Sequence, residues 1–283
     1  GATTAGNMAM YANNNYALDL SYNGHAMLNN AQLNQISNEI TISFWAYGDL
    51  AQISNGNSLF YGVAANSTQR QLNIHLPWSD NYVYFDCGKV GNDYDRVSKT
   101  TVPSERGGQW NHWVFTKNAT AGTMRVYLNG VQWLLGNNKI KPVSLFNLVL
   151  GKDLDLNNNF KGKINEISIW NAEISAADIV AWMNKPITNA HPNYNNLIAY
   201  YKANEGTGQV INDSKFNLTS TGTNMQWSFD RGHNLTRMFT ESASRPRVVF
   251  LRGNYTLNTS TISMLDSVPR YALAVQQYSI TNN

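Results

Sequence analysis

The chain of 283 residues contains one cysteine, few charged residues and no long apolar run. The single thiol, Cys87, excludes an internal disulfide and a metal site built from several cysteines. Charged residues make up 14% of the chain, well below the roughly 25% of an average globular protein. With 21 Lys and Arg against 18 Asp and Glu, and no basic cluster, the composition argues against nucleic-acid binding. No segment reaches the ~18 apolar residues of a membrane-spanning helix.

The first residues, GATTAGNMAMYANNN, contain neither the positive nor the apolar region of a secretory signal. Uncharged polar residues, asparagine above all, take the place of the missing charges, and this composition suits exported β-proteins. We therefore expect a secreted or cell-surface protein whose export signal has been removed. We also expect the chain to be part of a longer, multidomain protein.

What the sequence does contain is a succession of short alternating runs. Residues 109–130, QWNHWVFTKNATAGTMRVYLNG, predict a β-hairpin in which Trp113 and Phe115 share one face. Asn118–Thr123 supplies the residues of the turn, and Asn129-Gly130 ends the second strand. A hairpin with one apolar face must pack that face against another sheet, which indicates a β-sandwich.

Similar runs recur about every ten residues, as in a sandwich of short strands. One helix is predicted, with Ser175 as its N-cap, Ile179 and Trp182 on an apolar stripe that we expect to pack in the core, and Pro186 as its stop. The fold class that we predict is all-β: a two-sheet antiparallel sandwich with one short helix. Residues 1–230 form this domain, and 231–283 form a β-rich C-terminal extension or the start of a further module.

Five fragments stand out in the order of the chain: ALDLSYNGHAML from Ala17, ITISFWAY from Ile40, the hairpin of residues 109–130, KGKINEISIWNAEISAADI from Lys161 and LIAYYKANEGTGQVINDS from Leu197. Together they resemble the laminin-G-like, concanavalin A-like lectin/glucanase jelly rolls of secreted or surface bacterial proteins. The resemblance implies two curved antiparallel sheets packed face to face in a jelly roll. It also implies a role in handling carbohydrate, such as bacterial glycan utilisation.

The chain lacks the acidic pattern of the enzymes that share this fold. A retaining glycosidase needs two carboxyl groups about 5–5.5 Å apart, and the resemblance implies Glu-x-Asp-x-Glu on one strand. The corresponding strand here, Lys161–Trp170, contains only Glu166, while Asp86 and Asp95 are separated by a break at Gly88–Asn92. The sequence favours a protein that is not an enzyme. A glycosyl hydrolase, or an accessory module of one, remains the alternative.

The resemblance also implies a possible metal site, because members of the family often hold a structural calcium between an early Asp-Gly loop and a late Asp-Ser loop. In this chain the early position is Asn23-Gly24, and only Asp213 of the late loop keeps its carboxylate. We expect no cofactor and leave open one structural calcium ion with Asp213 as its candidate ligand.

A ligand-binding face is predicted between His75 and Arg96. Alternation directs Leu72 and Ile74 toward the core. It directs Asn73 and His75, together with Tyr82 and Tyr84, to the opposite face. Aromatic rings stack on the apolar faces of sugars, and planar polar groups form paired hydrogen bonds with hydroxyls. We expect Asp95 and Arg96 to join this face from the next loop. The candidate ligand-binding residues are His75, Trp78, Asp80, Tyr82, Tyr84, Asp86, Asp95 and Arg96.

These residues favour a non-catalytic, lectin-like module with carbohydrate as its partner. For any one aromatic residue, packing within the sandwich is the alternative explanation, so the hypothesis depends on the group. Tyr and Trp also anchor protein interfaces. An adhesion module that binds a protein is therefore a third interpretation.

Overall fold

A computed structural model describes residues 16–28, 30–53 and 56–228 of the chain. The predicted β-rich extension at 231–283 lies outside the described residues, so its assignment stays a prediction. Strands dominate the described part, and none of its helices is long and apolar enough to cross a bilayer. The prediction of an all-β fold is confirmed.

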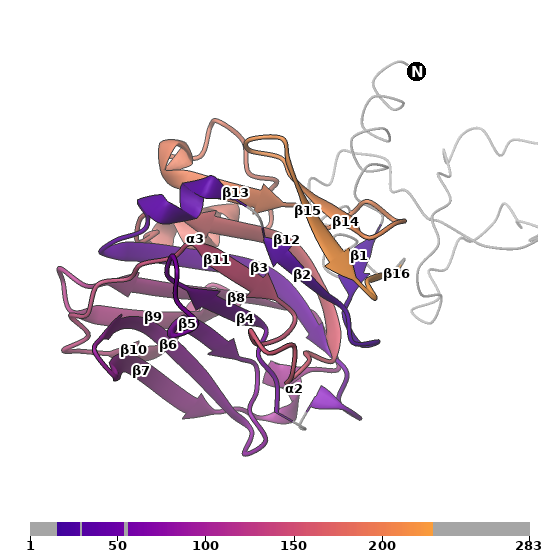
Figure 1. The fold of residues 1–283 in the computed structure, drawn as a ribbon, viewed down its shortest axis with the longest axis horizontal. Helices are drawn as coiled ribbons and strands as arrows, with labels where there is room; N and C mark the ends of the chain where they lie inside the picture. Colours follow the sequence, from indigo (N-terminus) through magenta and orange to yellow (C-terminus); the bar gives the residue numbers. More distant parts are fainter. Residues whose placement is uncertain (1–15, 29, 54–55, 229–283) are drawn as a thin grey trace, which may run out of the picture. The chain divides into compact units, whose positions relative to one another are not determined.

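The strands form one continuous antiparallel path that folds back on itself (Figure 1). Its first half runs β10 (Val131–Gly136), β9 (Thr123–Leu128), β8 (Asn111–Asn118), β3 (Glu39–Gly48), β12 (Gly162–Trp170), β13 (Leu197–Tyr201) and β14 (Val210–Asp213). The second half runs β15 (Leu218–Thr223), β2 (His25–Leu28), β11 (Asn147–Leu150), β4 (Phe60–Val63), β5 (Arg70–His75), β6 (Tyr82–Val90) and β7 (Asp93–Thr100). The short strands β1 (Ala17–Asp19) and β16 (Gln226–Ser228) pair with each other, and β1 also pairs with β12.

The two halves pack face to face over a single main core. Phe44 on β3 lies 5.3 Å from Phe60 on β4, measured between ring centroids. Farther along the sandwich, Phe85 on β6 meets Phe115 on β8 edge to face, also at 5.3 Å. Such edge-to-face pairs are a favoured aromatic geometry. The inward residues of both halves are fully buried, as expected for a jelly-roll sandwich.

The hairpin predicted from residues 109–130 forms β8 and β9, with its turn at the expected position. Trp113 and Phe115 enter the main core as predicted. The opposite face of β8 is also covered, because Val114 belongs to a second, smaller apolar cluster and His112 is buried. Alternation therefore identified the inner face correctly but did not reveal that the outer face is buried too.

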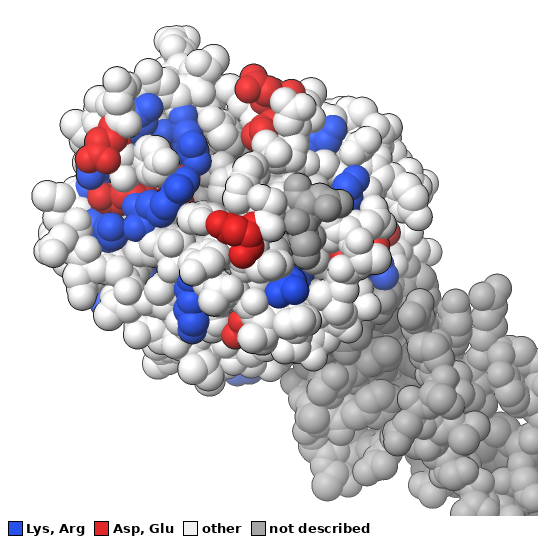
Figure 2. Space-filling model, turned by 90° about the horizontal axis from the view of Figure 1, so that it is seen from below, with Lys and Arg blue, Asp and Glu red and all other residues white. Residues whose placement is uncertain are grey.

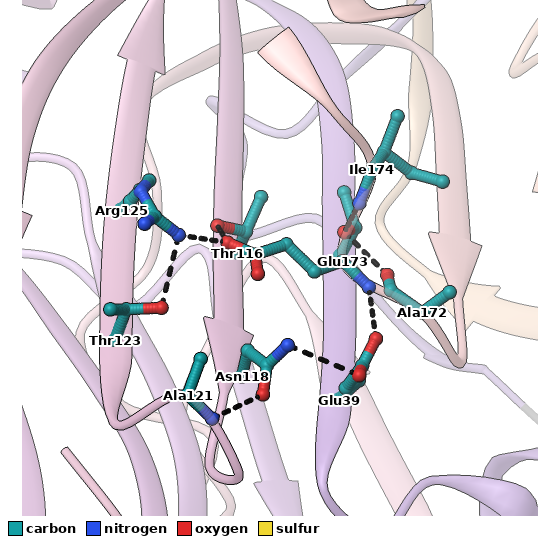
Figure 3. Close-up of polar contacts among 10 residues, drawn as sticks. Glu39, Thr116, Asn118, Ala121, Thr123, Arg125, Ala172, Glu173 and Ile174 are labelled. Carbon is teal, nitrogen blue, oxygen red and sulfur yellow. Dashed lines mark hydrogen bonds and ion pairs between the residues drawn. The ribbon is translucent and has the colours of Figure 1, made fainter.

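The outer cluster is covered by the segment that leads into α3 (Ala176–Trp182). Figure 3 shows how this segment is fixed to the sheet: Glu173 binds Arg125 of β9, and its backbone N–H donates to Glu39 of β3 at 2.8 Å. Asn118 of β8 donates to the other oxygen of Glu39 at 3.1 Å. Three neighbouring strands thus hold one loop in place.

The predicted helix is confirmed as α3. Ser175 is its N-cap, and its hydroxyl accepts the backbone N–H of Asp178, which satisfies a donor that the first helical turn leaves unpaired. Ile179 packs in the outer cluster, whereas Trp182 is half-buried and contacts the tilted ring of His191, with 4.9 Å between the ring centroids. The remaining helices of the described residues are short: α2 (Pro103–Arg106), η1 (Ala31–Gln35) and η3 (Tyr194–Asn196).

The two ends of the strand path, β10 and β7, approach each other. Lys99 of β7 places its ammonium group 4.4 Å from the ring centre of Trp133 and donates to the Trp133 carbonyl at 3.0 Å. Trp133 lies at an irregularity of the β9–β10 pairing, between Gln132 and Leu134. The sandwich is therefore nearly closed on this side.

Candidate functional site

The candidate site is a cavity of about 460 Å³ on the outer face of β4, β5 and β6, with residues from nearby loops at its rim. The strand register places Tyr61, Asn73, Asp86 and Arg96 side by side across β4 to β7. These four strands are neighbours at the lower left of Figure 1. The cavity is lined by Ser58, Tyr61, Arg70, Asn73, His75, Trp78, Asp80, Tyr84, Arg96, Asp153 and Asn158.

A hydrogen-bonded chain forms part of the cavity floor. The His75 Nδ1–H donates to the Asn57 carbonyl at 2.5 Å, and the Asn73 side-chain amide lies 3.1 Å from His75 Nε2. Burial lowers the pKa of His75, and its hydrogen bond to Asn57 only partly opposes this effect. His75 is therefore a neutral ring at pH 7, positioned from both of its nitrogens.

Beneath the cavity, the buried carboxylate of Asp86 holds two arginines. Arg70 donates to Asp86 at 2.5 Å, and Arg96 donates through Nε at 2.5 Å and through Nη2 at 2.8 Å. Both guanidinium groups also lie over the ring of Tyr94, at 4.9 and 5.1 Å, and Arg96 lies 4.8 Å from the ring of Tyr84. Cation–π contacts and ion pairs fix both side chains while parts of them remain exposed.

One wall of the cavity is formed by the turn between β5 and β6. Trp78 packs against His75, with 4.5 Å between the ring centroids. The Tyr84 hydroxyl donates to Asp80 at 2.6 Å, and the Tyr82 backbone N–H donates to the same carboxylate at 3.0 Å. Desolvation opposes ionisation of Asp80, but these hydrogen bonds outweigh it and lower the pKa of Asp80. Two aromatic rings and one carboxylate are thus held around the opening.

Most of the predicted site residues come together here. His75, Trp78, Asp80, Tyr84 and Arg96 line the cavity. Asp86 lies beneath it, and Tyr82 stacks on Tyr84 at 5.9 Å, outside the lining.

The prediction was wrong for Asp95 and for the segment that carries it. Residues 93–100 form β7 and not a loop. Because side chains alternate along a strand, Asp95 points away from the face that Arg96 occupies. Asp95 is buried, and its carboxylate binds Lys117 at 2.7 Å and Lys141 at 3.1 Å. It belongs to the interior of the sandwich and not to the cavity.

Sequence reasoning did not select six lining residues. Asn73 lies two residues before His75 on the same strand face, so alternation contained the signal for it. Tyr61 and Arg70 reach the cavity through strand pairing between β4 and β5. Ser58, Asp153 and Asn158 come from loops, where the sequence carries no periodic signal.

The three acids considered for a glycosidase each bind a different set of side chains. Asp86 binds Arg70 and Arg96, Asp95 binds Lys117, and Glu166 accepts a hydrogen bond from Tyr200 on a different pair of strands. Asp86 and Asp95 point to opposite faces of their sheet, and Glu166 lies on β12 in the other half of the strand path, so these three carboxylates do not form the pair that retaining hydrolysis needs.

The surroundings of Asp213 do not fit a calcium ion. Its Oδ1 accepts the backbone N–H groups of Tyr200 and Lys215, both at 2.8 Å. Its Oδ2 accepts from Phe216 N–H and from the Asn30 side chain, both at 3.3 Å. Calcium requires oxygen ligands, whereas N–H donors surround this carboxylate. Within the described residues no three His, Cys, Asp or Glu side chains are grouped as a metal site.

Comparison with known families agrees with this fold. A laminin-G-type family model, described as "Concanavalin A-like lectin/glucanases superfamily", matches residues 20–180. The chain belongs to this superfamily. The matched range contains the whole cavity. No curated protein sequence matches the chain.

Several solved structures are similar to the chain. A Bacteroides ovatus protein named a "putative carbohydrate binding protein" is 16% identical, with a TM-score of 0.56; the match covers 76% of this chain and 59% of that one. The chain thus spans about three fifths of the length of that protein. A pentraxin from Limulus polyphemus is 15% identical, with a TM-score of 0.46 and coverage of 59% and 81%. The ligand-binding domain of botulinum neurotoxin serotype D, solved with N-acetylneuraminic acid, is 20% identical, with a TM-score of 0.45 and coverage of 59% and 41%.

Proposed function

We propose that the chain is a non-catalytic carbohydrate-binding module and that the cavity on β4, β5 and β6 is its glycan site. The observation that carries the proposal is the lining itself, in which Trp78 and Tyr84 lie beside guanidinium, amide and carboxylate groups. Aromatic rings with fixed planar hydrogen-bonding groups suit a pyranose, which has apolar faces and polar edges. The Bacteroides ovatus protein named a "putative carbohydrate binding protein" has the same fold, and its name also supports the proposal.

The proposal places the module outside the cell, as part of a longer secreted or cell-surface bacterial protein that uses glycans. The low charge content and the fold family support this setting. Calcium is not needed for it, because the cavity offers preformed protein donors and acceptors.

Replacing Trp78 or Tyr84 with alanine is expected to weaken glycan binding about thirtyfold, since a buried aromatic anchor contributes about 2 kcal/mol. A glycan array identifies bound sugars with the unaltered chain, and titration calorimetry then measures Kd for each variant. Tyr22→Ala is the matched control, because Tyr22 is 70% exposed in the turn between β1 and β2, outside the cavity. Equal glycan affinity in the unaltered chain and all three variants would refute the proposed site. An array without any bound glycan would refute the proposed function.

A further inference from the structure

The orientation of the Asn73 side chain is determined by its neighbours. A backbone carbonyl can only accept, so the His75 nitrogen facing Asn57 O, Nδ1, must carry the proton. In the neutral ring Nε2 is then an acceptor, and Asn73 must present its NH₂ group to it. The opposite amide orientation would place two acceptors against each other. The Asn73 carbonyl oxygen is therefore directed away from His75.

This oxygen is a buried acceptor without a hydrogen-bond partner in the described part of the chain. Asn73 is 2% exposed and lines the cavity. Buried polar atoms of native proteins are almost always paired, and an unpaired one costs about 1–3 kcal/mol. Several other buried side-chain atoms of the described residues also lack a hydrogen-bond partner, but of these residues only Asn73 lines the cavity. Its oxygen is therefore the acceptor that a donor group of a ligand in the cavity would satisfy.

The charges around the cavity do not favour an anion. The ionisable groups that line or underlie it carry two positive charges, on Arg70 and Arg96, against three negative charges, on Asp80, Asp86 and Asp153. Both arginines direct N–H groups at Asp86, so their charges are largely compensated. Figure 2 shows one face of the molecule, where most of the visible described surface is uncharged and basic side chains lie beside acidic ones.

We infer that the cavity selects uncharged sugars over acidic ones and that Asn73 Oδ1 accepts a hydrogen bond from a sugar hydroxyl or amide N–H. The inference rests on the proposed function and adds the class of glycan. A hydroxyl can donate to Asn73 and accept from a guanidinium N–H at the same time, because Arg has five N–H groups and Asp86 engages only some of them. A carboxylate in that position offers no donor and meets Asp80 and Asp153.

The first test compares oligosaccharides that differ only in a carboxylate. Suitable probes are methyl-esterified and de-esterified oligogalacturonides, and cello-oligosaccharides with and without oxidation of C6 to the acid. In 0.15 M NaCl the uncharged member of every bound pair is expected to bind at least tenfold more tightly. Equal or tighter binding of the acidic member would overturn the inference and leave the proposed function intact. If the array shows no bound glycan and none of these probes binds, both the inference and the proposed function are refuted.

The second test assigns the acceptor. Asn73→Ala is expected to weaken binding of the best neutral probe at least tenfold, whereas Asn92→Ala, in the exposed turn between β6 and β7, changes nothing. Monodeoxy derivatives of that probe are then titrated into both the unaltered chain and Asn73→Ala. One derivative should lose affinity with the unaltered chain only, because its missing hydroxyl is the donor to Asn73. Equal losses in both proteins would overturn the assignment, and circular dichroism shows that the variant is folded.

Discussion

Replacing Lys117 with alanine is expected to lower the free energy of unfolding by about 3–5 kcal/mol, the cost of breaking a buried ion pair from one side. Lys117 has no exposed surface, and its ammonium group binds Asp95 at 2.7 Å and the Lys139 carbonyl at 2.8 Å. The substitution leaves the Asp95 carboxylate buried with only Lys141 as its cation. Urea unfolding at pH 7, followed by tryptophan fluorescence, measures the change.

Two comparisons separate this effect from simple loss of volume. Lys89→Ala, at a half-buried lysine on β6, is expected to change stability by less than about 0.5 kcal/mol. Lys117→Met combined with Asp95→Val is expected to be more stable than Lys117→Ala, because it leaves neither charge unpaired. A loss of less than about 1 kcal/mol in Lys117→Ala would show that the pair contributes little.

The same pair predicts a dependence on pH. Burial would raise the pKa of Asp95, but hydrogen bonds from Lys117 and Lys141 outweigh burial and lower it. A carboxyl group with a lowered folded-state pKa stabilises the fold above its unfolded pKa of about 3.9, and this contribution is lost as the pH falls through the folded-state value. The acid-induced loss of stability should therefore be smaller in the double variant than in the unaltered chain.

Asp86→Ala is expected to have the largest effect on ligand binding. The substitution leaves Arg70 and Arg96 side by side without the carboxylate that they share. Because both guanidinium groups are partly exposed, we expect a stability loss of about 2–3 kcal/mol, below that of a fully buried pair. Glycan affinity should fall by at least about thirtyfold, because the two arginines lose their fixed orientation.

The matched control is Asp93→Ala on the neighbouring strand. The Asp93 side chain is 80% exposed and pairs with Lys141 at 3.0 Å, so its loss should cost less than about 1 kcal/mol and leave affinity unchanged. Asp86→Asn keeps the shape of the side chain but not its charge. Its losses of stability and of glycan affinity should lie between those of Asp86→Ala and Asp93→Ala. Unchanged glycan affinity in Asp86→Ala would show that the arginine positions do not matter for the ligand.

The difference between what alternation revealed and what it missed has one physical cause. Between Leu72 and Asp86 the inward residues are apolar and the outward ones polar, so the sequence indicated both faces correctly. In β7 the inward positions are Asp95 and Val97, and the first is an acid paired with the buried Lys117. A polar pair in the interior removes the apolar alternation that would have marked the strand.

The candidate site was predictable to the extent that it lies on one hairpin. His75, Trp78 and Tyr84 come from β5, β6 and their turn, where local spacing determines which side chains are neighbours. Tyr61 and Asp153 reach the cavity from separate parts of the chain. Their positions depend on strand pairing across the sandwich, which no local pattern specifies.

The contact between Lys99 and Trp133 has a consequence for association between molecules. A strand at the margin of a sheet exposes backbone groups on which another chain can add a strand, and lysine is one of the residues that natural proteins use to prevent this. The Trp133 carbonyl already accepts the Lys99 ammonium group, and the irregularity at Gln132–Leu134 disturbs the regular spacing that an added strand would need. We therefore expect this margin of the sandwich to resist edge-to-edge aggregation.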